Sequence, residues 1–140
     1  MNESSGVIPM TRSRVLLADD LAQVLSAVDA LLNNQFEIVA KVADGRSALN
    51  ETMALAPDLV VLDISMPGLS GIEVARELKK RGSKARIVFL TVHEDSDILA
   101  ACLAAGGLGY VAKVLMQSDL IPAMNEAMAD RPFVSRFSSS

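Results

Sequence analysis

Short apolar runs alternate with segments of helical periodicity along most of this chain. The apolar runs predict five strands, most of them covered on both faces as in a parallel sheet, at residues 15–18, 36–42, 59–62, 87–90 and 110–112. Apolar residues three and four apart predict five helices, at about residues 24–32, 46–55, 71–81, 95–103 and 119–128. Alternating strands and helices favour an α/β fold, and we expect a flavodoxin-like (βα)5 three-layer sandwich with strand order 2-1-3-4-5.

Turn formers, caps and prolines suggest where the domain and its last helix begin and end. We expect residues 1–13 to be a flexible tail, residues 14–130 to be one domain, and residues 131–140 to be a second tail. Within that second tail, Phe133, Val134 and Phe137 could either pack back or begin a linker. For the last helix we expect Asp119 as N-cap, because Pro122 then needs no intrahelical partner.

Composition and charge exclude several classes of function. Thirteen basic and seventeen acidic residues give a net charge of −4, which argues against direct binding of nucleic acid by this chain. One cysteine cannot form an internal disulfide, and the first nine residues lack a signal pattern, so we expect a cytoplasmic protein. No apolar run approaches the roughly 20 residues that span a bilayer, so no membrane association is expected.

Polar residues follow four of the five predicted strands, and they carry the candidate chemistry. Asp19 and Asp20 follow the first strand, Asp63 the third, Thr91 the fourth and Lys113 the fifth. A single aspartate after a strand is more often a turn or cap residue than a catalyst. In the order 2-1-3-4-5, however, the first and third strands are neighbours, so all three carboxylates should meet at one edge of the sheet.

Three neighbouring carboxylates repel one another, and a hard divalent cation would neutralise them. Magnesium fits best, because it binds few carboxylates and usually keeps its remaining positions for water and phosphate. The charge of Lys113 and the hydroxyl of Thr91 suit the oxygens of a phosphoryl group. An aspartate can itself attack phosphorus and form an acyl phosphate.

These motifs together resemble the receiver domain of two-component response regulators, over residues 15–128. The motifs that carry the resemblance are Asp19-Asp20, Asp63 before Met66-Pro67-Gly68, Leu90-Thr91, and Gly109-Tyr110-Val111-Ala112-Lys113. The segment Met66-Pro67-Gly68-Leu69-Ser70-Gly71 is most similar to that of receivers of the NarL/FixJ type, which usually precede a DNA-binding helix-turn-helix. The chain is then either a free-standing receiver or a fragment that lacks its output domain. Val114 departs from the family, which often has proline there.

The resemblance implies a role for each of these residues. Asp19, Asp20, Asp63 and the backbone carbonyl of Ser65 would hold Mg²⁺. Asp63 would accept a phosphoryl group from a histidine kinase or phosphotransfer protein, Thr91 and Lys113 would contact that group, and Thr91 and Tyr110 would act as the switch. The face formed by the fourth helix, fifth strand and fifth helix would bind an effector or a second copy. The chain would not be an enzyme beyond its own phosphotransfer and dephosphorylation.

Three alternatives differ from this hypothesis in class. A degenerate receiver would bind partners without phosphorylation, but every site residue is present here. A phosphatase with an aspartyl-phosphate intermediate would need a second aspartate at position 65, which is serine. A flavin-binding protein shares the fold class, but the Asp19-Asp20-Leu21 turn offers a phosphate no glycine-rich cradle.

Overall fold

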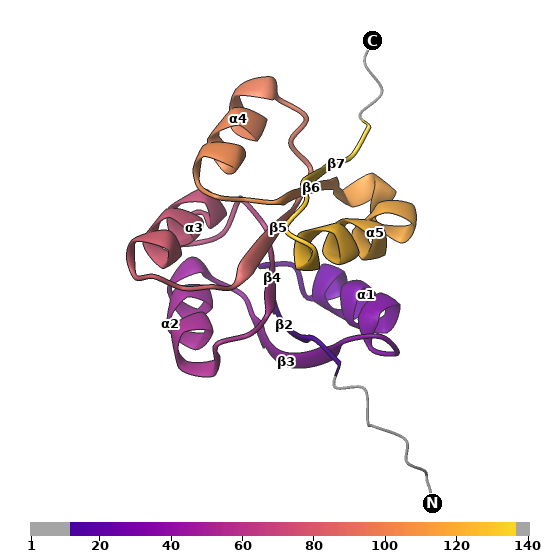
Figure 1. The fold of residues 1–140 in the computed structure, drawn as a ribbon, viewed down its shortest axis with the longest axis horizontal. Coiled ribbons are helices and arrows are strands. Elements are labelled where there is room, and N and C mark those ends of the chain that lie inside the picture. Colours follow the sequence, from indigo (N-terminus) through magenta and orange to yellow (C-terminus); the bar gives the residue numbers. More distant parts are fainter. Residues whose placement is uncertain (1–11, 137–140) are drawn as a thin grey trace, which may run out of the picture.

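The computed structural model describes residues 12–136, which form a parallel sheet between two layers of helices (Figure 1). Its six strands lie in the order β3-β2-β4-β5-β6-β7. Their bounds are Arg14–Ala18 for β2, Glu37–Val42 for β3, Leu59–Leu62 for β4, Arg86–Thr91 for β5, Gly109–Ala112 for β6 and Phe133–Val134 for β7. The predicted flavodoxin-like order is confirmed, with one further strand added beside β6.

Five α-helices cover the sheet. They are α1 (Ala22–Leu32), α2 (Gly45–Leu55), α3 (Gly71–Lys80), α4 (Ser96–Ala104) and α5 (Met116–Met128). Figure 1 shows α1 and α5 on one face of the sheet and α2, α3 and α4 on the other, so the predicted three-layer sandwich is confirmed. None of the described helices is long and apolar enough to cross a bilayer.

Alternate residues of the central strands pack into two separate hydrophobic cores, because successive side chains point to opposite faces of a sheet. Leu16, Val60 and Phe89 pack toward α2, α3 and α4. Leu17, Val61 and Val88 pack toward α1 and α5. Burial on both faces explains why these strands read as continuous apolar runs.

Helix α5 begins three residues earlier than predicted, and the prediction of Asp119 as its N-cap is wrong. The helix starts at Met116, directly after a 3-10 turn at Lys113–Leu115, and Pro122 lies inside it. Pro122 cannot donate to the carbonyl of Ser118 one turn earlier, which costs stability. Met116, which lies in the added turn, packs against the core between the sheet and α1 and α5, and this contact favours the longer helix despite that cost.

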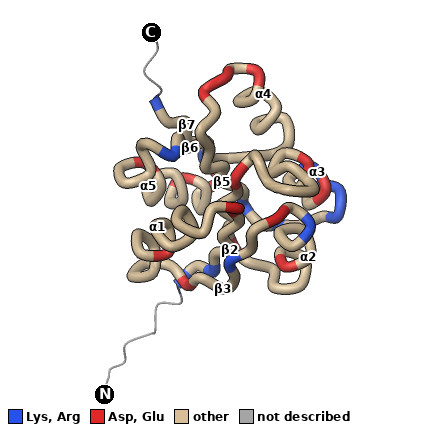
Figure 2. Tube along the Cα trace, turned by 180° about the vertical axis from the view of Figure 1, so that it is seen from behind, with Lys and Arg blue, Asp and Glu red and all other residues tan. Residues whose placement is uncertain are grey.

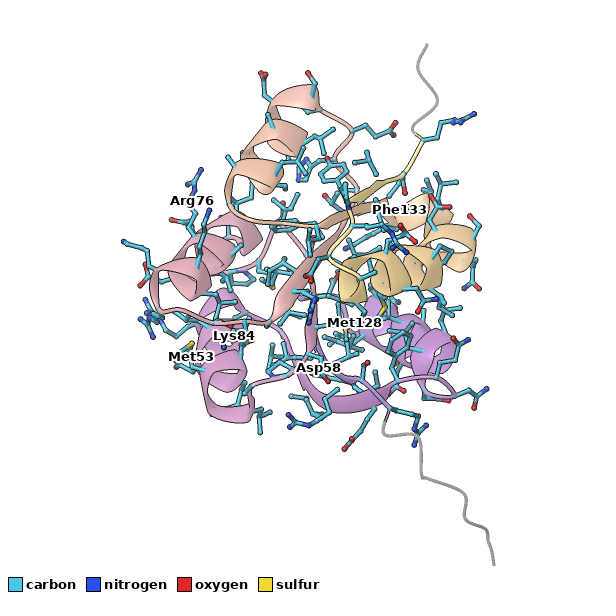
Figure 3. The ribbon with its side chains drawn as sticks, viewed as in Figure 1. Met53, Asp58, Arg76, Lys84, Met128 and Phe133 are labelled. Atoms are coloured by element: carbon cyan, nitrogen blue, oxygen red, sulfur yellow. The ribbon has the colours of Figure 1, made fainter. Side chains whose placement is uncertain are left out.

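The segment after α5 packs back onto the domain. Phe133 and Val134 pair with Gly109 and Tyr110 as the edge strand β7, and Figure 3 shows Phe133 next to α5. Of the two alternatives for this segment, packing back is therefore the one that residues 133–135 adopt. Residues 1–11 of the first predicted tail and residues 137–140 of the second, Phe137 among them, lie outside the described residues.

Candidate functional site

The predicted site residues meet where β2, β4, β5 and β6 end. Ala18 and Leu62, the last residues of β2 and β4, are partners in register, so the aspartates that follow them lie side by side. The backbone N–H of Asp63 donates to the carbonyl oxygen of Ala18 at 2.9 Å. Parallel strands thus deliver these polar residues to one edge of the sheet, as the strand order predicted.

Three carboxylates gather at this edge. Asp19, Asp20 and Asp63 each contribute an oxygen, and these oxygens all lie within 4.8 Å of one another. Figure 2 shows acidic positions in red at the middle of the molecule, near the labels of β2 and β5. Asp19 and Asp63 are only 3% and 5% exposed, whereas Asp20 is exposed. The cluster is therefore buried at its base and open at Asp20.

Lys113 is the cation nearest to the carboxylates in the described part of the chain. Its Nζ lies 2.8 Å from Asp19 Oδ2 and 3.6 Å from Asp63 Oδ2. Asp19 Oδ2 is buried and accepts no well-aligned hydrogen bond, so its contact with Lys113 is an ion pair only. One lysine against three carboxylates leaves a net charge of −2 when all are ionised. An oxygen-rich, negatively charged site with an unsatisfied buried acceptor fits a hard divalent cation.

The environment of Asp63 disfavours its charged form. Burial raises the pKa of Asp63 above its ordinary value, and the neighbouring charge of Asp19 raises it further. The charge of Lys113 and the backbone N–H groups of Ser65 and Ile64 oppose this rise in pKa. A cation bound at this site would therefore stabilise the charged form of Asp63.

Thr91, Tyr110 and Ser65 all contact the same residue, His93. The Thr91 hydroxyl oxygen is fully buried and accepts from the backbone N–H of His93 at 3.0 Å. The Tyr110 hydroxyl donates to the carbonyl oxygen of His93 at 2.7 Å. The Ser65 hydroxyl lies 2.9 Å from His93 Nε2. The β5–α4 loop is thereby tied to the site on one side and to β6 on the other.

Tyr110 is already buried in this structure. Its side chain is only 1% exposed, and burial raises the pKa of its phenol to about 12. If Tyr110 acts as the predicted switch, its ring moves from a position that is already buried in this structure.

Sequence reasoning identified the carboxylates, Thr91 and Lys113, but not His93 or the Ser65 hydroxyl. Ser65 and His93 each lie three positions after the end of a predicted strand, which makes them reasonable candidates for contact with the site. No local pattern indicates that these two residues meet, because they lie 28 residues apart in the chain.

Comparison with known proteins places the chain among signalling proteins. The model of the family described as response regulator receiver domain matches residues 15–125. The transcriptional regulatory protein PdtaR of Mycobacterium tuberculosis is 35% identical over 117 residues, which are 83% of this chain and 57% of PdtaR. Chemotaxis protein CheY of Bacillus subtilis is 29% identical over 116 residues, which are 82% of this chain and 97% of CheY.

A solved structure agrees with these sequence matches. The two-component response regulator of the LuxR family from Aurantimonas sp. SI85-9A1 superposes with a TM-score of 0.83 at 30% identity, covering 88% of this chain and 89% of that one. The chain thus matches almost the full length of CheY but only a little over half of PdtaR.

Proposed function

This chain belongs to the response regulator receiver domain family, and from that premise we propose that it is a phosphoacceptor module of two-component signalling. Asp63 takes the phosphoryl group of a phosphohistidine on a histidine kinase or phosphotransfer protein. The observation that carries this proposal is the position of Asp63, a buried carboxylate with two other carboxylates and the Lys113 ammonium around it. The chain catalyses no reaction other than its own phosphorylation and dephosphorylation.

The chemistry is a displacement at phosphorus. An oxygen of the Asp63 carboxylate forms a bond to phosphorus while the P–N bond of the phosphohistidine breaks. The electron pair of that bond stays on the imidazole nitrogen of the donor, which then takes a proton. Lys113 offsets negative charge on the transferred oxygens, and the Thr91 hydroxyl can donate to one of them.

Asp19, Asp20, Asp63 and the backbone carbonyl of Ser65 would hold Mg²⁺. The bound ion would neutralise charge shared between the carboxylates and the phosphoryl oxygens. The buried Asp19 Oδ2, which lacks a hydrogen bond, supports this role. Replacing Asp20 by alanine should weaken magnesium binding measured by titration, and unchanged affinity in Asp20→Ala would show that the ion binds elsewhere.

Exposed apolar side chains surround the acidic site and are suited to contact a donor protein. Leu21, Val92 and Val114 are 49%, 67% and 86% exposed, and each directly follows a site residue in the chain. Because Asp63 is buried between these loops, a protein that brings phosphohistidine to it must touch them. A small donor such as acetyl phosphate makes no such contact.

Comparing a protein donor with acetyl phosphate therefore distinguishes loss of the donor-binding surface from loss of phosphoryl transfer itself. Val92→Ser and Val114→Ser should slow phosphoryl transfer from an autophosphorylated histidine kinase and leave transfer from acetyl phosphate unchanged. Met53→Ser is the matched control, because Met53 is also an exposed apolar residue but lies elsewhere, on α2. It shares a pocket with Asp58 and Lys84, which precede β4 and β5 at the other end of the strands (Figure 3). Equal loss of kinase transfer in Met53→Ser would contradict a localised donor surface.

Phosphorylation would change the domain through Thr91, His93 and Tyr110. If Thr91 turns toward the phosphoryl group, its bond with the His93 N–H is lost, and the contact of Tyr110 with the His93 carbonyl can change with it. The affected face is that of α4, β6 and α5, where an effector or a second copy would bind.

Tyr110 is the only tyrosine and the chain has no tryptophan, so tyrosine fluorescence reports on this residue alone. Beryllofluoride, which imitates a phosphoryl group on Asp63, should change that fluorescence and the NMR signals of α4. Shifts confined to the loops around Asp63 would contradict switching through this face.

The test of the proposed function is labelling by acetyl phosphate with and without magnesium. We expect one phosphoryl group per chain, dependent on magnesium and labile in base. A degenerate receiver that only binds partners would show no label under any of these conditions.

A further inference from the structure

The hydroxyl of Ser135 joins two elements that lie on either side of Lys113 in the chain. Ser135 is only 3% exposed, and its Oγ accepts from the backbone N–H of Ala112 at 3.1 Å. The same hydroxyl donates to Asp119 Oδ2 at 2.7 Å. Ala112 is the last residue of β6, and Asp119 lies in the first turn of α5. One hydroxyl thus links the start and the end of the segment that carries the site lysine.

Strand β7 holds Ser135 in this place. The N–H of Phe133 donates to Leu108, and the N–H of Ser135 donates to Tyr110, at 2.9 and 2.8 Å. The pairing of β6 with β7 ends at Tyr110 and Val134. Beyond it, the N–H of Ala112 on β6 donates to the side chain of Ser135 instead of to a backbone carbonyl. A buried N–H is almost always satisfied, so this hydroxyl replaces a strand partner.

The segment between these two anchors has few other restraints. The 3-10 turn at Lys113–Leu115 has no side-chain cap, and neither has the start of α5. Val114 is 86% exposed and adds little packing. The Ser118 hydroxyl lies 2.9 Å from Asp119 Oδ1 and 3.1 Å from the carbonyl oxygen of Leu115, so it links the same anchor to the end of this turn. The direction of the Lys113 side chain therefore depends on where Ala112 and Asp119 are held.

We infer that Ser135 and Asp119 form a positioning pair for Lys113, which rests on the proposed role of Lys113 in phosphoryl transfer. Ala112 is also the register partner of Thr91, so the same anchor borders both residues that contact the phosphoryl group. Ser135 itself touches neither the site carboxylates Asp19, Asp20 and Asp63 nor the transferred group. Its effect reaches the reaction through the position of the Lys113 ammonium, 2.8 Å from Asp19 Oδ2.

The experiment measures the rate of magnesium-dependent labelling of the chain by acetyl phosphate. Ser135→Ala and Asp119→Ala should each lower this rate, on the order of ten-fold, because a small displacement of a charged group in such a site is costly. Ser83→Ala is the matched control, since the Ser83 hydroxyl likewise accepts a backbone N–H, that of Ala85 at 3.2 Å, near the opposite end of β5. The control should label at the rate of the parent.

A cycle with Lys113→Ala separates positioning from general loss of structure. If Ser135 acts through Lys113, then adding Ser135→Ala to Lys113→Ala should lower the rate no further. Ser135→Thr, which keeps the hydroxyl, should recover most of the rate of the parent. If Ser135→Ala does not fold, the half-exposed Asp119 still allows the same cycle with Asp119→Ala.

Either of two results would overturn the inference. One is an unchanged rate in Ser135→Ala and Asp119→Ala, and the other is an equal further loss in the Lys113→Ala background. Failure of the proposed function looks different, because then the parent chain itself takes no label on Asp63.

Discussion

Strand β4 has an aspartate at each end, and the two are held in opposite ways. Asp58 precedes the strand, is half-buried, and accepts from the backbone N–H of Arg14 through Oδ2 at 2.8 Å. Asp63 follows the strand, is almost fully buried, and lies beside two other carboxylates. At one end the charge satisfies a neighbouring donor, and at the other it is placed among charges of the same sign.

The surroundings of the two residues extend this contrast. At the Asp58 end, Arg86 pairs with Asp130 at 3.0 Å, and the Arg14 guanidinium donates to the carbonyl oxygen of Leu55 at 2.8 Å. At the Asp63 end, Asp19 Oδ2 has only an ion pair with Lys113. The first end favours stability, and the second gives up stability for a site that can bind a cation and a phosphoryl group.

The largest expected effect on stability distinguishes two glycines near the two ends of the strands. A Cβ on Gly71 would lie 2.1 Å from the carbonyl oxygen of Asp63, so the backbone must move. Gly71→Ala should lower the free energy of unfolding by about 3 kcal/mol or more. Gly82 has φ +76° but open space around it, and Gly82→Ala should cost only about 1–2 kcal/mol. Urea denaturation measures both, and equal losses would contradict the close packing behind Asp63.

The next effect is at Asp58. Asp58→Ala leaves the half-buried N–H of Arg14 without its acceptor, so the free energy of unfolding should fall by about 1–2 kcal/mol. Asp58→Asn keeps an oxygen acceptor and should lose less. Thermal unfolding of both variants tests this, and a stable Asp58→Ala would show that water replaces the carboxylate at no cost.

A smaller effect of opposite sign is expected at Asp63. Asp63→Asn removes a charge that burial and Asp19 both disfavour, so the variant should have a slightly higher free energy of unfolding than the parent in the absence of divalent cations. The measurement is denaturant unfolding with a chelator present, because a bound cation would stabilise the parent. A less stable Asp63→Asn would mean that the ion pair with Lys113 outweighs the repulsion.

The smallest effect is the pH dependence, which also differs in sign between the two ends. The pKa of Asp63 is raised in the folded state, so its ionised form costs stability at neutral pH and protonation removes that cost. The stability gap between Asp63→Asn and the parent should therefore narrow as the pH falls toward about 4.

The opposite end provides the control for this pH series. The hydrogen bond from Arg86 lowers the pKa of Asp130, so its contribution is present above the unfolded pKa and is lost as the pH falls through the folded one. Asp130→Asn should be less stable than the parent at neutral pH, with the two converging in acid. Parallel pH curves for the two variants would contradict the assigned directions.

Much of the site could be predicted because it follows from strand order. Buried strands read as apolar runs, and the order 2-1-3-4-5 places Asp19 beside Asp63 whatever the details of packing. Asp19 and Asp63 directly follow these neighbouring strands, so the strand order alone brings them together.

The remaining features depend on tertiary contacts that leave no periodic signal. Strand β7 has two residues, too few to show an alternation, and it forms because β6 offers a free edge. The start of α5 differs from the prediction because the local rule for Pro122 takes no account of the packing of Met116 against the core. Asp119, expected to cap its own helix, instead accepts from the Ser135 hydroxyl.

Locating the phosphoryl group on the chain tests the central claim most directly. The parent, Asp58→Asn and Asp63→Asn are incubated with acetyl phosphate and magnesium, and the labelled residue is mapped by mass spectrometry of peptides. Asp58 and Asp63 flank the same strand, so the comparison holds the surrounding sequence constant. We expect one label on Asp63 in the parent and in Asp58→Asn, and none in Asp63→Asn. A label of equal stoichiometry in Asp63→Asn would contradict the assignment of Asp63 as the phosphoacceptor.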